Sequence, residues 1–161
     1  MQEHASVHES FMRLAIEQAR CGMANGEGGP FGAVVVKDGQ VIAVGNNRVT
    51  STNDPTAHAE IVAIREACRR LGSFQLEGCV LYTSCEPCPM CLGAIYWARP
   101  ARVFFGCTRH DAAAIDFDDA FIYQEMAAPL QERRIEMTPL LREEALAVFA
   151  LWREKADKVR Y

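Results

Sequence analysis

Four residues in the middle of the chain have types and spacing that can support metal chemistry. His58 and Glu60 are two positions apart, and Cys88 and Cys91 have the C-x-x-C spacing that lets two thiolates reach one ion. One imidazole with two thiolates suits zinc, and a catalytic zinc site leaves its fourth position to water. Glu60 is close enough to such a water to move its protons without becoming a ligand. The pattern predicts His58, Cys88 and Cys91 as ligands of one Zn2+ per subunit, with Glu60 as the catalytic acid and base.

Other interpretations of these residues stay open at the level of sequence. Cys85 and Cys88 also have C-x-x-C spacing and form a rival ligand pair. Pro89 favours Cys88 and Cys91, because proline is typical of a first helical turn and places both of these thiols there. A purely structural zinc site would need a fourth ligand. Iron is a further metal that the spacing does not exclude.

The predicted ligands lie at the starts of two predicted helices. Apolar residues at helical spacing predict helices over 57–71 and 88–98, and β-branched runs predict strands over 79–83 and 103–107. The remaining expected elements are a hairpin of strands 31–36 and 41–44 and helices at 8–23, 120–126 and 143–158. This order predicts an α/β fold in which both helix starts meet at one sheet edge, where helix dipoles favour thiolates.

Length, composition and charge narrow the class of protein. The 161 residues suit a single domain, and half of them are apolar, as in an ordinary globular core. A net charge of -4 favours a small, neutral substrate over nucleic acid. No run approaches the length of a membrane span, no leader peptide is recognisable, and seven cysteines are an odd number for a disulfide framework. We therefore expect a cytoplasmic protein without a membrane or nucleic-acid partner.

Beyond the ligands, longer motifs resemble a known group of proteins. They are Gly29–Val34 (GPFGAV), Asn53–Glu60 (NDPTAHAE), Tyr82–Cys91 (YTSCEPCPMC), Gly93–Ala98 (GAIYWA), Phe117–Tyr123 (FDDAFIY) and the terminal Tyr161. The chain resembles the cytidine-deaminase-like superfamily, and within it the short, zinc-binding bacterial guanine deaminases. The resemblance implies a three-layer αβα fold with a five-stranded mixed sheet and helices on both faces. It also implies a single domain over 1–161 whose C-terminal segment, about 130–161, is swapped between the subunits of a homodimer.

The same resemblance implies a reaction, the hydrolysis of guanine to xanthine and ammonia, and a set of substrate contacts. These contacts are Asn47, Asp119, Phe31, Trp97, Ala59 and Tyr161, the last acting across the dimer. An ionised aspartate suits guanine, because the purine presents N–H donors. Four of these contacts have a plainer alternative: Asn47 caps a turn, Asp119 caps the following helix, and the rings of Phe31 and Trp97 belong to the core.

Three other functions are compatible with the zinc motif. The first is a deaminase of another free base, nucleoside or s-triazine, such as cytosine, cytidine or ammeline. The second is a tRNA adenosine deaminase, which must bind a flipped base on a polyanion. The third is a non-catalytic zinc module, against which Glu60 argues because a scaffold needs no proton shuttle.

Overall fold

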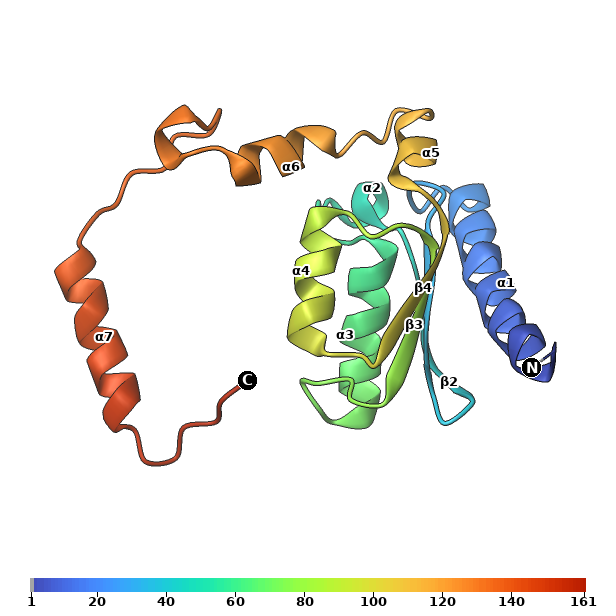
Figure 1. The fold of residues 1–161 in the computed structure, drawn as a ribbon, viewed down its shortest axis with the longest axis horizontal. Helices are drawn as coiled ribbons and strands as arrows, with labels where there is room; N and C mark the ends of the chain where they lie inside the picture. Colours follow the sequence, from blue (N-terminus) through green and yellow to red (C-terminus); the bar gives the residue numbers. More distant parts are fainter. Residues whose placement is uncertain (1) are drawn as a thin grey trace. The chain divides into compact units, whose positions relative to one another are not determined.

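A computed structural model describes residues 2–161 (Figure 1). Its strands are β1 (Gly32–Lys37), β2 (Gln40–Asn46), β3 (Cys79–Cys85) and β4 (Arg102–Cys107). Its helices are α1 (Gln2–Ala24), α2 (Val49–Thr52), α3 (Ala59–Leu71), α4 (Pro89–Ala98), α5 (Arg109–Ala113), α6 (Ala120–Ala127) and α7 (Arg142–Glu154), with a 3-10 turn at η1 (Leu130–Glu132). The predicted hairpin and the predicted helices are therefore confirmed, with boundaries that move by up to six residues, the largest shift being the start of α1.

The four strands form one mixed sheet in the order β2-β1-β3-β4. β1 is antiparallel to both β2 and β3, whereas β3 and β4 are parallel and are joined through α4. The β1–β2 turn is tight, because Asp38 and Gly39 both have positive φ, at 50° and 74°. Because β3 and β4 are parallel, both strands end at the same edge of the sheet, and the loops that follow them begin there.

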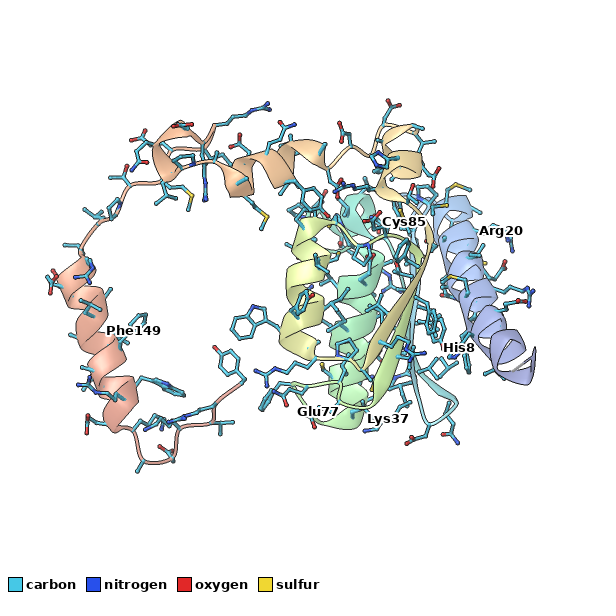
Figure 2. All side chains as sticks on the ribbon, viewed as in Figure 1. His8, Arg20, Lys37, Glu77, Cys85 and Phe149 are labelled. Carbon is cyan, nitrogen blue, oxygen red and sulfur yellow. The ribbon has the colours of Figure 1, made fainter. Side chains whose placement is uncertain are left out.

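Helices cover both faces of this sheet, as predicted (Figure 1). The alternation along β1 explains the arrangement, since successive side chains point to opposite faces. Val34 and Val36 pack with Ala15 of α1, whereas Ala33 and Val35 belong to the core beneath α3 and α4. On the α1 side lies His8, which is labelled in Figure 2. Its Nδ1 atom is 2.7 Å from the hydroxyl of the buried Tyr82.

The expectation of five strands is wrong, because the sheet has four. After β4 the chain turns directly into α5 instead of forming another strand. Thr108 and Asp111 form a capping box there: the Asp111 carboxylate accepts from Thr108 N at 2.7 Å, and Thr108 Oγ1 accepts from Asp111 N at 3.3 Å. This box starts a helix. Among residues 2–161, no segment pairs with the outer edge of β4.

A close approach of α3 to β2 sets the position of the first turn of α3. A Cβ atom at Gly45 would lie 2.4 Å from the Ala59 carbonyl oxygen and 2.7 Å from Ala63 N. Only glycine lets the helix pack at this distance. The turn that carries His58 and Glu60 is thereby held directly against the sheet.

The chain divides into two compact units, one ending at Asp119 and the other comprising Ala120–Tyr161. The first unit contains the sheet, α1 to α5 and the predicted metal ligands. Neither α6 nor α7 of the second unit has a buried residue, and large apolar side chains such as Phe149 and Leu151 of α7 are exposed. In the described part of the chain, no helix is both long and apolar enough to cross a membrane.

Candidate active site

His58 and Cys88 occupy equivalent positions, each as the N-cap residue of a helix. Both have extended backbone angles, and neither side chain makes a capping hydrogen bond. An N-cap is normally Ser, Thr, Asp or Asn, whose side chain accepts from the helix backbone. Here both side chains instead point to a common location. Cys91 joins them from the first turn of α4, which Pro89 starts.

The three predicted ligands are close enough to share one ion. His58 Nδ1 lies 3.5 Å from Cys88 Sγ and 3.5 Å from Cys91 Sγ, and the three ligand atoms all lie within 4.8 Å of one another. Nitrogen and sulfur ligands at about 2.0 Å and about 2.3 Å on a tetrahedral zinc are separated by about 3.5 Å. The donor set and its spacing therefore fit Zn2+, with His58 binding through Nδ1.

The electrostatics of this cluster favour a first thiolate on Cys88. The hydrogen bond from Cys91, and then that from His58, lower the pKa of Cys88 to about 4 although burial acts in the opposite direction. The pKa of Cys91 is raised, because its proton is held by Cys88 and because the residue is buried. The hydrogen bond with Cys88 raises the pKa of His58. The cluster shares protons that a bound metal ion would replace.

Glu60 lies beside the cluster and is almost completely enclosed. Its side chain is buried, Oε1 accepts from Thr83 Oγ1 at 2.9 Å, and Oε2 lies 3.4 Å from Cys91 Sγ. Burial raises the pKa of Glu60, and the hydrogen bond from Thr83 opposes that shift. A carboxylate with a raised pKa, next to the ligands but not one of them, is suited to take up and return protons.

Cys85, the rival ligand, lies outside the cluster. Its thiol donates to the Thr108 carbonyl at 3.6 Å, and burial raises its pKa to about 11. In the part of the chain that the structure describes, the metal-binding group of His, Cys and acidic side chains comprises His58, Cys88 and Cys91. The geometry therefore favours these three over a Cys85–Cys88 pair.

Two of the predicted substrate contacts, Asn47 and Phe31, are joined by a backbone hydrogen bond and lie in segments that pack near α3. Asn47 is buried, and its backbone N–H donates to the Phe31 carbonyl at 3.0 Å. Arg48 N donates to the Ala57 carbonyl, which ties this segment to the residue before His58. The side chain of Asn47 does cap a turn, because Oδ1 accepts from Val49 N at 3.1 Å. The predicted contact and the turn-capping alternative are thus compatible.

The other predicted contacts differ in their surroundings. Ala59 is fully buried at the first position of α3. Asp119 is half-buried, and burial followed by the negative charge of Cys88 raises its pKa. Trp97 is 63% exposed, so it is not a core residue. Tyr161 belongs to the second unit and is also exposed, so its action at an active site stays a prediction.

Two neighbours of the site were not predicted. Thr83 holds Glu60, and the ring of Phe117 meets that of Phe31 edge-on, with centroids 4.9 Å apart. A sequence signal for Thr83 does exist, because it is a polar residue in the apolar run that predicts a strand over 79–83. Nothing in the spacing connects Phe117 with Phe31, which is 86 positions earlier in the chain.

Residues 5–107 match the cytidine and deoxycytidylate deaminase zinc-binding region. The chain is 56% identical to guanine deaminase of Bacillus subtilis over 154 residues, which cover 96% of this chain and 99% of that protein. The X-ray structure of that guanine deaminase superposes with a TM-score of 0.93 over 96% of this chain and 98% of the other.

Two further relatives differ in what they act on or bind. A tRNA-specific adenosine deaminase of Aquifex aeolicus is 46% identical, but over 97 residues, which are 60% of this chain and 64% of that protein. A mutant of the protein NE0047, solved in complex with 8-azaguanine, is 34% identical with a TM-score of 0.67, covering 89% of this chain and 82% of the other.

Proposed function

This chain belongs to the zinc-binding cytidine and deoxycytidylate deaminase family, and we propose that it hydrolyses guanine to xanthine and ammonia. One observation carries the choice of substrate. The match to the Bacillus subtilis guanine deaminase spans 154 of 161 residues, so it includes the chain beyond residue 107, where the shared zinc-binding region ends. The match to the tRNA-specific enzyme spans only 97 residues.

The proposal gives each residue of the cluster a role. His58, Cys88 and Cys91 would hold Zn2+, which when bound supplies an activated water for attack on C2 of the base. Glu60 removes a proton from that water and delivers protons to the ring nitrogen and to the departing amine. Thr83 holds the carboxylate in place through its 2.9 Å hydrogen bond.

The substrate is held, in this proposal, by groups that match the edges of guanine. The Asn47 Oδ1 atom already accepts from Gly29 N and Val49 N, so Nδ2 is the group that can donate to an acceptor on the purine. Asp119 accepts from purine N–H donors. Phe31 and Trp97 would form the walls around the ring, and Ala59 at the start of α3 is a further proposed contact.

We also propose that the two compact units make up one deaminase domain completed by dimerisation. The apolar side chains of α7 are exposed, including Phe149 at 71% and Leu151 at 72%. Exposed apolar surface of this kind favours association. The segment from about 130 to 161 would cover the partner subunit and bring Tyr161 to its active site. Analytical ultracentrifugation of the full chain and of a chain ending at residue 129 tests this proposal.

Ammonia release tests the substrate assignment. The zinc-loaded protein is incubated with guanine, adenine, cytosine, cytidine, ammeline and guanosine, and Glu60→Gln serves as the matched inactive control. Selective release from guanine is the expected result. Release from another base with guanine ignored would leave the zinc mechanism in place and refute the assignment of guanine.

A second candidate function is deamination of adenosine in tRNA, favoured by the 46% identity to the Aquifex aeolicus enzyme. The net charge of -4 argues against it, because binding to a polyanion depends on basic surface. Salt-sensitive binding of tRNA, followed by conversion of adenosine to inosine, would establish this function instead.

A cytoplasmic location is part of the proposal. All seven cysteines are free, including Cys88 and Cys91 of the cluster. Thiolate ligands without disulfides suit a reducing compartment. Cell fractionation followed by immunodetection tests the location.

A further inference from the structure

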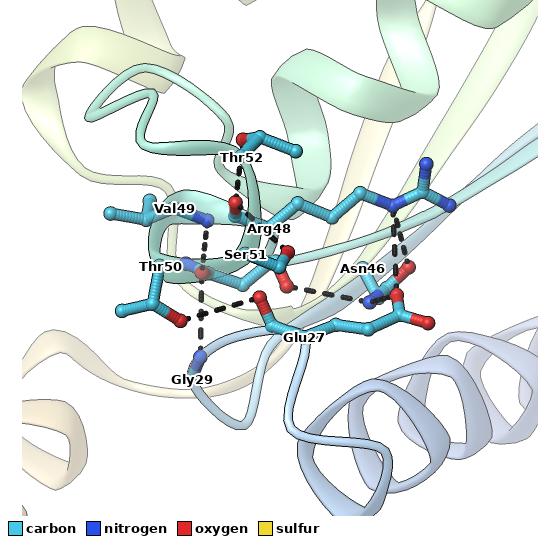
Figure 3. Close-up of polar contacts among 9 residues, drawn as sticks. Glu27, Gly29, Asn46, Arg48, Val49, Thr50, Ser51 and Thr52 are labelled. Atoms are coloured by element: carbon cyan, nitrogen blue, oxygen red, sulfur yellow. Dashed lines mark hydrogen bonds and ion pairs between the residues drawn. The ribbon is translucent and has the colours of Figure 1, made fainter.

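A hydrogen-bond network outside the metal cluster joins the loop after α1 to the segment after β2 (Figure 3). Glu27 is at its centre. The Glu27 Oε2 atom accepts from Asn46 Nδ2 at 2.6 Å and lies 3.7 Å from Arg48 Nε. The Glu27 backbone carbonyl accepts from Ser51 N at 3.3 Å. One residue of the loop therefore binds both the beginning and the end of the neighbouring segment.

Asn46, the last residue of β2, links Glu27 to the buried part of the protein. It is buried, and its Nδ2 donates to the Asn47 carbonyl at 3.3 Å as well as to Glu27. Its Oδ1 accepts from Arg48 Nε at 3.3 Å. A Cβ atom at Gly22 would lie 2.3 Å from Asn46 Nδ2, so α1 packs directly on this amide. Both ends of the amide therefore have hydrogen-bond partners, and the packing of α1 leaves it little room to move.

The loop that contains Glu27 also touches Asn47 directly. Oδ1 of Asn47 accepts from Gly29 N at 3.3 Å. A Cβ atom at Gly28 would lie 2.3 Å from Oδ1 and 2.4 Å from the Asn47 carbonyl oxygen. Because the loop backbone approaches this closely, its position limits how the Asn47 amide is oriented, and with Oδ1 engaged Nδ2 is the amide atom left to donate to a ligand.

We infer that Glu27 is a positioning residue for substrate binding, which acts through Asn46 and the loop backbone to hold the Asn47 amide with Nδ2 as the donor. This inference rests on the proposed function, in which Asn47 contacts the purine. Without the Glu27 carboxylate, Asn46 Nδ2 loses its charged acceptor, and the loop loses its side-chain contacts with Asn46 and Arg48. Glu60 is held by Thr83, outside this network, so the chemical step should be preserved.

The first test compares two variants of Glu27. Glu27→Ala should raise KM for guanine by up to roughly tenfold, the effect of losing the hydrogen bond that Asn47 Nδ2 donates to the purine, with kcat changed less than about twofold. Glu27→Gln keeps an acceptor oxygen for Asn46, so its KM should stay within about threefold of wild type. Glu9→Ala, which removes an exposed ion pair with Arg13 on α1, is the control and should leave KM unchanged. Equal KM values for Glu27→Ala and wild type would overturn the inference.

A double-mutant cycle with Asn47→Ala tests whether the effect passes through Asn47. In the Asn47→Ala background, Glu27→Ala should add less than about twofold to KM, because the group that it positions is gone. Full additivity of the two KM effects would overturn the inference. Thermal unfolding of each variant shows whether it is folded at the assay temperature.

A readout without substrate separates this inference from the proposed function. In wild type the amide protons of Gly29 and Val49 are bonded to Asn47 Oδ1. Hydrogen exchange at these two amides, followed by NMR, should be roughly tenfold faster in Glu27→Ala and close to wild type in Glu27→Gln. Unchanged exchange in Glu27→Ala refutes the positioning role even if guanine is deaminated. If wild type does not deaminate guanine but the Gly29 and Val49 amides exchange faster in Glu27→Ala, only the substrate assignment is refuted.

Discussion

The hydrogen bond between Thr83 and Glu60 can be tested by its effect on the pH dependence of catalysis. Oγ1 of Thr83 donates to Oε1 of Glu60 at 2.9 Å, and both side chains are buried. The bond stabilises the carboxylate and lowers the pKa of Glu60, against burial, which raises it. A hydrogen bond to a charged group contributes about 1.5–3 kcal/mol, and one pKa unit corresponds to about 1.36 kcal/mol. Removing it should therefore raise the pKa of Glu60 further.

Thr83→Val removes the hydroxyl while keeping a branched side chain of similar shape. If the Glu60 carboxylate accepts the first proton, the acidic limb of the kcat/KM profile should move to higher pH by about one to two units, because the carboxylate is protonated over a wider range. Thr83→Ser keeps the donor and should give the wild-type profile. Zinc content measured on the same samples excludes metal loss. An acidic limb that does not move in Thr83→Val would refute the reasoning.

Three other predictions concern the metal cluster, the proton shuttle and the packing of α3. Glu60→Gln should keep one zinc per subunit, measured by atomic emission, and lose about two to four orders of magnitude in kcat. Cys91→Ser should lose zinc whereas Cys85→Ser should retain it, and the opposite result would identify the rival ligand pair. Gly45→Ala places a Cβ atom 2.4 Å from a carbonyl oxygen of α3, so it should lower the free energy of unfolding, measured by urea titration, by about 1–3 kcal/mol or more. The control is Gly93→Ala on α4, whose Cβ atom meets open space. It should raise the free energy of unfolding by up to about 1 kcal/mol.

The local elements and the metal ligands could be predicted because their signals are short-range. The spacing of apolar residues predicted the helices and strands, and the structure confirms them with boundary shifts of up to six residues. Cys88 and Cys91 are three positions apart in one helical turn, so their convergence follows from helix geometry alone. His58 could be added because it precedes the other helix that starts at the same sheet edge.

The number of strands and the contacts around the cluster were decided only by the tertiary structure. The capping box of Thr108 and Asp111 directs the chain into α5, so the sheet stops at four strands. Glu27 and Asn46 are 19 positions apart and Glu60 and Thr83 are 23 apart, and no periodicity links either pair. Such pairs meet because helices pack on a sheet at fixed distances. The sequence by itself therefore determined which residues can bind zinc, whereas the packing of α1 and α3 on the sheet decided which groups orient Asn47 and Glu60.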